Sequence, residues 1–365
     1  MSDDTLIQSQ PKVLFIPVSQ EVGSGEYLRC MGIAERLQET QPDIELHFIV
    51  NKRGLIIDKP FIQHHATEGP PTFCEEQVEE VLRRLRPQVV IFDNALRRKI
   101  AKVAHELGAW TAFISSRPKK RRVGFDPRKT QFINQHWIIT QPTQHRLSTI
   151  ERLIRPGSQD VEFFSAMQTT GGAPDDSLRA LIPETFLRNF VLFCPGGGSG
   201  EINGTPTGSF FQTAARDFAC NTNIPTVLIA GPQANVTLKR TDKYFEISSL
   251  PTKEFSQLLS KAELFVSGAG SQLLQALALN KPCLAIQAQG KDQKQRLKGL
   301  LKQDVVATAP RTPQGLSMAA EELIQNPEEL GNLKARVVAG GFLNGLEPVA
   351  EKIAQKALAS KTSVR

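Results

Sequence analysis

The sequence predicts a two-domain α/β protein in which each domain is a doubly wound parallel sheet with helices on both faces. Short apolar runs alternate with helical patterns along the whole chain, which is typical of βαβ units. The alternation restarts after a polar, turn-rich segment at residues 168–176, and 365 residues are too many for one ordinary core. We therefore expect an N-terminal domain over residues 1–167, a linker over 168–188 and a C-terminal domain over 189–365. The last helix is a candidate to pack back on the N-terminal domain.

In the N-terminal half, apolar runs predict strands at residues 12–18, 44–50, 89–92, 110–114 and 137–140. Apolar residues at helical spacing predict helices at residues 27–37, 75–86 and 97–107, the second of which stops at Pro87. Each helix lies between two strands, so we expect the strands to run parallel.

The C-terminal half repeats this architecture without repeating the sequence. Strands are predicted at residues 189–194, 226–230, 244–247, 264–267 and 282–287. Helices are predicted at residues 210–220, 252–261, 270–279 and 293–302, and over much of 312–359. Ligands of such sheets bind at the carboxyl ends of the strands, so we expect the strand-end loops of both domains to face one cleft.

Composition indicates a soluble protein of the reducing cytoplasm. No apolar run reaches the roughly 18 residues of a membrane span, and the acidic start lacks the profile of a signal peptide. The five cysteines (Cys30, Cys74, Cys194, Cys220 and Cys283) form no CxxC pair, and the six histidines form no metal motif. Neither a disulfide framework, a metal site nor a cofactor is expected, and Cys194 and Cys283 are expected to be buried. The net charge of +7 permits attraction to anions without choosing among them.

The strongest local feature is the glycine loop, which we define as residues 196–200 (Gly196, Gly197, Gly198, Ser199 and Gly200). It directly follows a predicted strand. Glycines let backbone N–H groups approach an anion, and a nest of such groups suits a diphosphate. The spacing matches neither the Walker A pattern nor GxGxxG. The alternative is a flexible surface loop, and we favour phosphate contact.

A second loop of small residues, Ser267, Gly268, Ala269, Gly270 and Ser271, lies between a predicted strand and a predicted helix. Small residues leave the helix N-terminus open, where free N–H groups and the helix dipole favour negative charge. A tight strand–helix turn is the alternative, but two such loops in one domain strengthen the prediction of a phosphate site.

A third small-residue turn, with Gly23 and Gly25, precedes Glu26 in the N-terminal domain. Glu26 lies in the first turn of a predicted helix, where its carboxylate is a candidate general base. The equally weighted alternative is an acid that the helix dipole stabilises. Asp93, which with Asn94 ends a strand, is a candidate to orient a base or a substrate hydroxyl. Ordinary turn chemistry is slightly favoured for this pair.

The densest basic stretch runs from Arg117 to Arg122 and continues at Arg128 and Lys129. It is a candidate for weak contact with an anionic membrane or acceptor. RNA is disfavoured as a partner because few aromatic residues accompany these charges. We expect the stretch to be a mobile, solvated loop.

The order of strand, glycine-rich turn and helix in both halves resembles the GT-B glycosyltransferases, which consist of two Rossmann-like domains. Residues 264–282 look like the donor-site segment of the N-acetylglucosaminyltransferases that make lipid II, and Asp292 with Gln293 matches the acid–Gln pair that meets the donor sugar in related enzymes. Residues 23–30 are similar to the nucleotide-sugar hydrolases of pseudaminic acid biosynthesis. The resemblance covers the whole chain in architecture, through short motifs.

This resemblance implies roles for individual residues. Gly197, Gly198 and Ser199 would contact the diphosphate, and backbone near Leu250 would contact the base. Gly270 and Ser271 would start the phosphate-facing helix, and Gln275 would meet the ribose. The sequence departs from the family at two positions, with Glu26 in place of a His and Gln275 in place of an acid.

The resemblance implies a metal-independent glycosyltransferase that moves a sugar from a nucleotide-diphosphate sugar, above all a UDP-sugar, to an acceptor hydroxyl. A place at the inner face of the membrane is compatible with this activity. Hydrolysis of a nucleotide sugar is the alternative that residues 23–30 favour. Binding of a nucleotide sugar without turnover is the alternative that the two departures favour.

Overall fold

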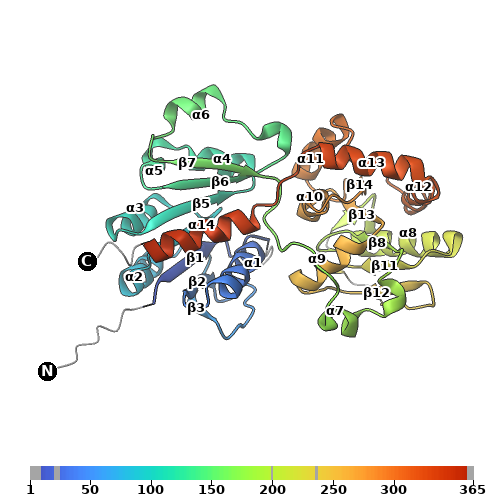
Figure 1. The fold of residues 1–365 in the computed structure, drawn as a ribbon, viewed down its shortest axis with the longest axis horizontal. Coiled ribbons are helices and arrows are strands. Elements are labelled where there is room, and N and C mark those ends of the chain that lie inside the picture. Colours follow the sequence, from blue (N-terminus) through green and yellow to red (C-terminus); the bar gives the residue numbers. More distant parts are fainter. Residues whose placement is uncertain (1–9, 20–24, 199, 235–236, 360–365) are drawn as a thin grey trace. The chain divides into compact units, whose positions relative to one another are not determined.

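The computed structural model describes residues 10–19, 25–198, 200–234 and 237–359 (Figure 1). The chain divides into two compact units, each of which is described by itself. Unit 1 comprises Met1–Thr140, Gln144–Gln168 and Gly345–Arg365, and unit 2 comprises Gln141–Thr143 and Thr169–Asn344. The last helix, α14 (Leu346–Ala359), thus belongs to the first unit, where it packs on α1 (Gly25–Thr40).

Unit 1 contains a seven-stranded parallel sheet within the described residues. Its strand order is β3-β2-β1-β4-β5-β6-β7. The strands are β1 (Lys12–Pro17), β2 (Glu45–Asn51), β3 (Ile62–Thr67), β4 (Val89–Asp93), β5 (Trp110–Ser115), β6 (Gln135–Ile139) and β7 (Asp160–Phe164). Pairing runs outward from β1 and β4 in opposite directions, so the strand order reverses between these two neighbours.

Helices cover both faces of this sheet because its central strands are apolar on both sides. Val13 and Phe15 of β1 pack with α1 and α14, whereas Leu14 and Ile16 pack with the opposite face. The second face is covered by α2 (Glu75–Leu85) and α3 (Arg98–Glu106). The remaining helices of the unit are α4 (Pro118–Gly124), α5 (Pro127–Thr130) and α6 (Thr149–Ile154).

Unit 2 contains a five-stranded parallel sheet in the order β12-β11-β8-β13-β14, within the described residues. The strands are β8 (Val191–Cys194), β11 (Thr226–Ile229), β12 (Tyr244–Ile247), β13 (Leu264–Gly268) and β14 (Cys283–Ile286). A short hairpin of β9 (Glu201–Ile202) and β10 (Thr205–Pro206) follows β8. Here the strand order reverses between β8 and β13.

One face of this second sheet is covered by α8 (Thr207–Thr222) and α12 (Pro313–Gln325). The other face is covered by α7 (Asp176–Leu181), α9 (Thr252–Lys261), α10 (Ser271–Ala278) and α11 (Lys291–Lys302). Helix α13 (Pro327–Ala339) follows α12. The expected fold class, with two doubly wound parallel sheets, is confirmed.

Three expectations about local structure differ from what is observed. The edge strands β3 and β7 were not expected, because neither contains a continuous buried apolar run: in β3 only Ile62 and Thr67 are buried, and in β7 only Phe164. Residues 168–188 are not a free linker, since α7 lies in this segment and Leu178 and Ile182 are fully buried in the core of unit 2.

The third difference concerns the basic stretch from Arg117 to Arg122, which is a helix and not a mobile loop. Pro118 at the first position of α4 has the backbone angle that a helix start requires. Arg121 donates to both carboxylate oxygens of Glu151, at 2.7 and 2.8 Å. Lys120 Nζ donates to the carbonyl of Asn94 at 2.6 Å. These contacts hold the stretch on the unit.

Candidate functional site

The two small-residue loops of unit 2 lie at the ends of β8 and β13, the pair of strands between which the strand order reverses. In open α/β sheets, ligands bind outside the carboxyl ends of the strands at this position, because the flanking connections leave in opposite directions. The sequence pointed to both loops from their glycines. The topology adds that they are neighbours.

The glycine loop has a backbone that only glycine adopts without strain. Gly196, Gly198 and Gly200 have positive φ angles of 104°, 79° and 80°. The loop is also packed tightly against Gly231, which follows β11, because a Cβ on Gly231 would lie 2.5 Å from backbone atoms of Gly197 and Gly198. Gly197 itself is exposed, and a Cβ there would meet nothing nearer than 3.8 Å. Ser199 lies outside the described residues.

The second loop leads into α10 and leaves the N-terminus of this helix open. Gly268 packs on the carbonyl of Pro195, the residue before the glycine loop, which a Cβ would approach to 2.8 Å. A Cβ on Gly196 would lie 3.8 Å from Gln272 Oε1 of α10, so the glycine loop lies beside the start of this helix. Gly270 precedes α10 and provides no side-chain cap, while Ser271 is exposed. The first backbone N–H groups of α10 therefore have no intrahelical acceptor and can donate to a ligand beside the glycine loop.

Two long side chains of α11 hold backbone near this site, Arg296 on the second loop and Gln293 on the segment that follows β14. The sequence predicted a role for Gln293 but not for Arg296. Arg296 Nη1 donates to the buried Ala269 carbonyl at 2.6 Å. Gln293 Oε1 accepts the backbone N–H groups of Ala288 and Gln289, both at 3.0 Å. Arg296 lies one helical turn after Gln293, which was a signal for it in the sequence. Its partner, the Ala269 carbonyl, is distant in sequence, so no local pattern predicted the contact.

The remaining donor-site candidates have distinct surroundings. Gln275 is 2% exposed, and its Nε2 donates to Ser256 Oγ at 2.8 Å, so this donor is used to tie α10 to α9. Leu250, between β12 and α9, is partly buried against the core. Asp292 is exposed at the start of α11. The expected contacts of these residues with ribose, base and sugar stay predictions.

Glu26 of unit 1 lies in the first turn of α1 and is 8% exposed. Its Oε1 accepts hydrogen bonds from Asn94 Nδ2 at 3.0 Å and from Arg117 Nη2 at 3.3 Å. Among the described residues, no partner is assigned to Oε2. One carboxylate oxygen of Glu26 is thus anchored by two donors of unit 1. Gly25 begins the helix beside it, and Gly23 lies outside the described residues.

Asp93, at the end of β4, is fully buried and anchors α1 through Arg29. Arg29 Nε and Nη2 donate to the two carboxylate oxygens of Asp93, each at 2.7 Å. Burial raises the pKa of Asp93 to about 6, against the opposing influence of Arg29. Burial alone would lower the pKa of Arg29, but the ion pair raises it above its ordinary value.

This burial changes what can be expected of Asp93. With no exposed surface, its carboxylate does not contact a substrate hydroxyl, which was one of its two expected roles. The other expected role, orientation of the base, agrees with its position, because Arg29 lies one helical turn after Glu26 on α1. Cys30 is also buried against Asp93, and burial raises the pKa of its thiol, so this cysteine remains protonated.

All five cysteines lie among the described residues and are free. Cys194 and Cys283 are fully buried, as expected. No group of three or more His, Cys, Asp or Glu side chains among the described residues is arranged to hold a metal ion. Within the same residues, every helix is too short or too polar to cross a membrane.

The fold is shared with solved glycosyltransferases. UGT2 of Phytolacca americana, complexed with UDP-2fluoro-glucose and pterostilbene, matches with a TM-score of 0.63 at 10% identity over 95% of this chain and 99% of that one. The glycosyltransferase VinC in complex with DTDP matches with a TM-score of 0.63 at 13% identity, over 95% and 100%. A putative UDP-N-acetylglucosamine 2-epimerase from Listeria monocytogenes matches with a TM-score of 0.61 at 13% identity, over 98% of each chain.

No protein-family model and no curated protein sequence matches this chain. At these identities the structural similarity establishes the fold, which is the expected GT-B fold. The neighbours include both transferases and an epimerase, so the reaction has to be argued from the residues.

Proposed function

We propose that this chain is a glycosyltransferase that takes its sugar from a nucleotide-diphosphate donor held by unit 2. The observation that carries the proposal is the position of the glycine loop beside the open N-terminus of α10, at the point where the strand order reverses. Both elements present backbone N–H groups that suit a diphosphate. The neighbours solved with UDP-2fluoro-glucose and with DTDP support a donor of this class.

For the donor, we assign the diphosphate to Gly197, Gly198, Gly270 and Ser271. The base is assigned to backbone near Leu250, and the sugar to Asp292 and Gln293. A Cβ on Gly270 would lie 3.9 Å from Gln293 Nε2, which supports the placement of that amide beside the phosphate-facing helix. Uridine is preferred as the base from the resemblance in the sequence, with thymidine as the outcome that VinC suggests.

For the reaction, we assign Glu26 as the general base that removes the proton of the acceptor hydroxyl. The anomeric C–O bond to the diphosphate breaks as the bond to the acceptor oxygen forms, and the diphosphate leaves with the bonding electrons. Amides of the glycine loop and the α10 dipole would stabilise the developing charge, so this scheme uses no metal. Arg29 and Asp93 are positioning residues that hold α1 and hence Glu26.

Donor binding is tested best at Gly197, where the structure leaves room for a side chain. Gly198→Asp is a poorer test, because its Cβ would lie 2.6 Å from the Ala230 carbonyl and would disturb folding. We expect UDP or dTDP to raise the melting temperature of the wild type by mass action. Gly197→Asp places a carboxylate at the phosphate site and should abolish the shift. Gly157→Asp, at another exposed glycine with open space around it, is the matched control.

The proposal is abandoned if no nucleotide diphosphate raises the melting temperature of the wild type. It is also abandoned if Gly197→Asp and Gly157→Asp show the same nucleotide-induced shift in melting temperature. The chemical step is tested separately with Glu26→Gln, which should lower kcat by about 100-fold or more while leaving the nucleotide shift intact. If Glu26→Gln turns over normally, Glu26 is not the base.

Hydrolysis of the donor is the second candidate, favoured by the similarity of residues 23–30 to nucleotide-sugar hydrolases. Release of free sugar in the absence of any acceptor would establish it. A wild type that binds the nucleotide but consumes no donor, with or without acceptors, would instead favour binding without turnover.

Contact of Arg117 to Arg122 with an anionic membrane is a weaker proposal than the sequence suggested. Arg117, Lys120 and Arg121 make hydrogen bonds within unit 1. Lys119 and Arg122 remain exposed. Two free charges contribute little membrane affinity, at about 1 kcal/mol each near an anionic surface.

A further inference from the structure

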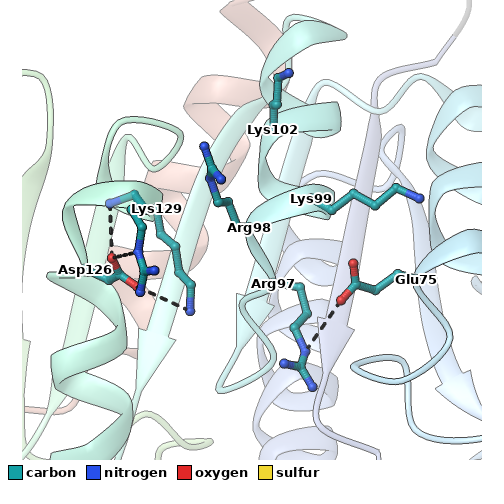
Figure 2. A pocket seen from close by; sticks show the side chains of 8 residues that line it. Glu75, Arg97, Arg98, Lys99, Lys102, Asp126 and Lys129 are labelled. Atoms are coloured by element: carbon teal, nitrogen blue, oxygen red, sulfur yellow. Dashed lines mark hydrogen bonds and ion pairs between the residues drawn. The ribbon is translucent and has the colours of Figure 1, made fainter.

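Unit 1 contains a basic hollow that the proposed glycosyl transfer does not use. Its volume is about 600 Å³, within the range of small-molecule sites. Figure 2 shows the side chains that line it, from α2, the start of α3 and the segment around α5. Six of them are basic: Arg97, Arg98, Lys99, Lys102, Arg128 and Lys129.

Among the described residues, two acidic side chains line the same hollow. Glu75 makes a loose pair with Arg97, with 3.9 Å between Oε1 and Nε. Asp126 is engaged by Arg128 at 3.1 and 3.2 Å and by Lys129 at 3.9 Å. Lys99 and Lys102 pair with carboxylates beside the hollow, Lys99 with Glu79 at 2.9 Å and Lys102 with Glu106 at 3.4 Å. Among the described residues, these four carboxylates leave two of the six cations in excess, and like charges gathered in one concavity raise the local concentration of counter-ions.

Arg98 is the least satisfied of these cations. It is exposed at the first position of α3, and no ion pair or hydrogen bond is assigned to its side chain within the described part of the chain. Figure 2 shows Arg98 between the Asp126–Lys129 group and the Arg97–Glu75 pair, with Lys102 one turn further along α3. A guanidinium in this position offers a planar pair of donors to a bidentate oxyanion.

The start of α3 adds donors of a second kind. Arg97 precedes the helix and supplies no side-chain cap, so the first N–H groups of α3 have no intrahelical acceptor. The helix dipole favours negative charge at the same end. The hollow thus combines three guanidinium groups, three ammonium groups and a helix N-terminus.

We propose that this hollow is a second anion site, which binds a phosphate-bearing group of at least two negative charges. Arg98 is its central ligand, and Lys102 and Lys129 flank it. The group can be carried by a free polyphosphate or by an anionic lipid headgroup. The inference does not depend on the donor site, because all lining residues belong to unit 1 and the glycine loop belongs to unit 2.

The test uses sodium tripolyphosphate as the free probe, measured by titration calorimetry on the full chain at about 50 mM NaCl. We expect saturable binding that Arg98→Gln weakens about tenfold, as for loss of one charge-assisted contact. Arg152→Gln makes the same charge change at an exposed position of α6 and should leave binding unchanged. Gly197→Asp should also leave it unchanged, which separates this site from donor binding.

The two sources are distinguished with vesicles. The fraction of protein that sediments with phosphatidylcholine vesicles is compared with the fraction that sediments with vesicles containing about 30% phosphatidylserine. The first vesicles are neutral, and the second have a negative surface potential like that of a cytoplasmic leaflet. Binding that requires the anionic lipid, falls with Arg98→Gln and is competed by tripolyphosphate supports a headgroup ligand. Tripolyphosphate binding without vesicle binding supports a free ligand.

Three results would overturn the proposal. One is the absence of saturable tripolyphosphate binding by the wild type. The second is unchanged affinity in Arg98→Gln. The third is an equal loss in Arg98→Gln and Arg152→Gln, since this would show diffuse attraction to the net charge in place of a site.

Discussion

The buried pair of Arg29 and Asp93 gives a quantitative prediction about the stability of unit 1. At 2.7 Å the two charges attract each other by about 6 kcal/mol for an effective dielectric constant near 20. Desolvation of both groups opposes this attraction, and the raised pKa of Asp93 shows that burial has the larger effect on the carboxylate. The pair is therefore costly to break and gives little net stability.

Asp93→Ala leaves the guanidinium of Arg29 buried without its partner. We expect the free energy of unfolding to fall by about 3–5 kcal/mol. The double variant Arg29→Met with Asp93→Leu removes both charges and keeps a similar volume. It should be as stable as the wild type or more stable, by up to about 4 kcal/mol.

The assay is urea unfolding followed by tryptophan fluorescence at pH 7. Both tryptophans of the chain, Trp110 and Trp137, lie in unit 1, so the signal reports this unit alone. The exposed Arg83, which pairs with Glu79 on the surface of α2, provides the control, because removal of its charge should cost less than about 1 kcal/mol.

The reasoning is refuted if Asp93→Ala costs no more than this exposed control, or if the double variant is as unstable as Asp93→Ala. A stable double variant also tests the positioning role. Its kcat should fall while KM for the donor stays unchanged, because Glu26 would lose the anchor of its helix.

Three further predictions concern other parts of the molecule. Gly231→Ala should lower the free energy of unfolding by about 2–4 kcal/mol and abolish the nucleotide-induced thermal shift, since its Cβ would lie 2.5 Å from the glycine loop. Its control is Gly204→Ala, at a glycine with positive φ but open space, which should cost only about 1 kcal/mol. Both are measured by urea unfolding followed by circular dichroism. Leu178→Ala should cost about 2–5 kcal/mol because the side chain is fully buried, whereas Leu181→Ala, 39% exposed, should cost less than about 1 kcal/mol in the same assay. Burial lowers the pKa of His136 from 6.5 to about 3, so the free energy of unfolding of unit 1 should fall by up to about 5 kcal/mol as the pH falls from 6.5 towards 3. In His136→Asn, unfolding followed by tryptophan fluorescence should show a smaller loss of stability over this pH range. An unchanged loss would show that another group causes it.

The sequence by itself determined the architecture, because apolar periodicity depends on neighbours along the chain. Central strands such as β1 and β8 are apolar on both faces and stand out from the helices around them. It also located the glycine loop, since a run of glycines after a strand records a backbone conformation that other residues avoid. The edge strands were not predicted, because a half-exposed strand such as β3 needs no continuous apolar run.

Only the tertiary structure decided how the candidate residues are used. Asp93 and Gln275 are both polar and sit next to loops that suggest ligands, yet each is turned inward to a partner, Arg29 or Ser256. Those partners are 64 and 19 residues away in sequence, so no local pattern reports them. The basic hollow around Arg98 arises in the same way. Its charges come from segments that are separate in sequence and become one site only when α2, α3 and α5 pack together.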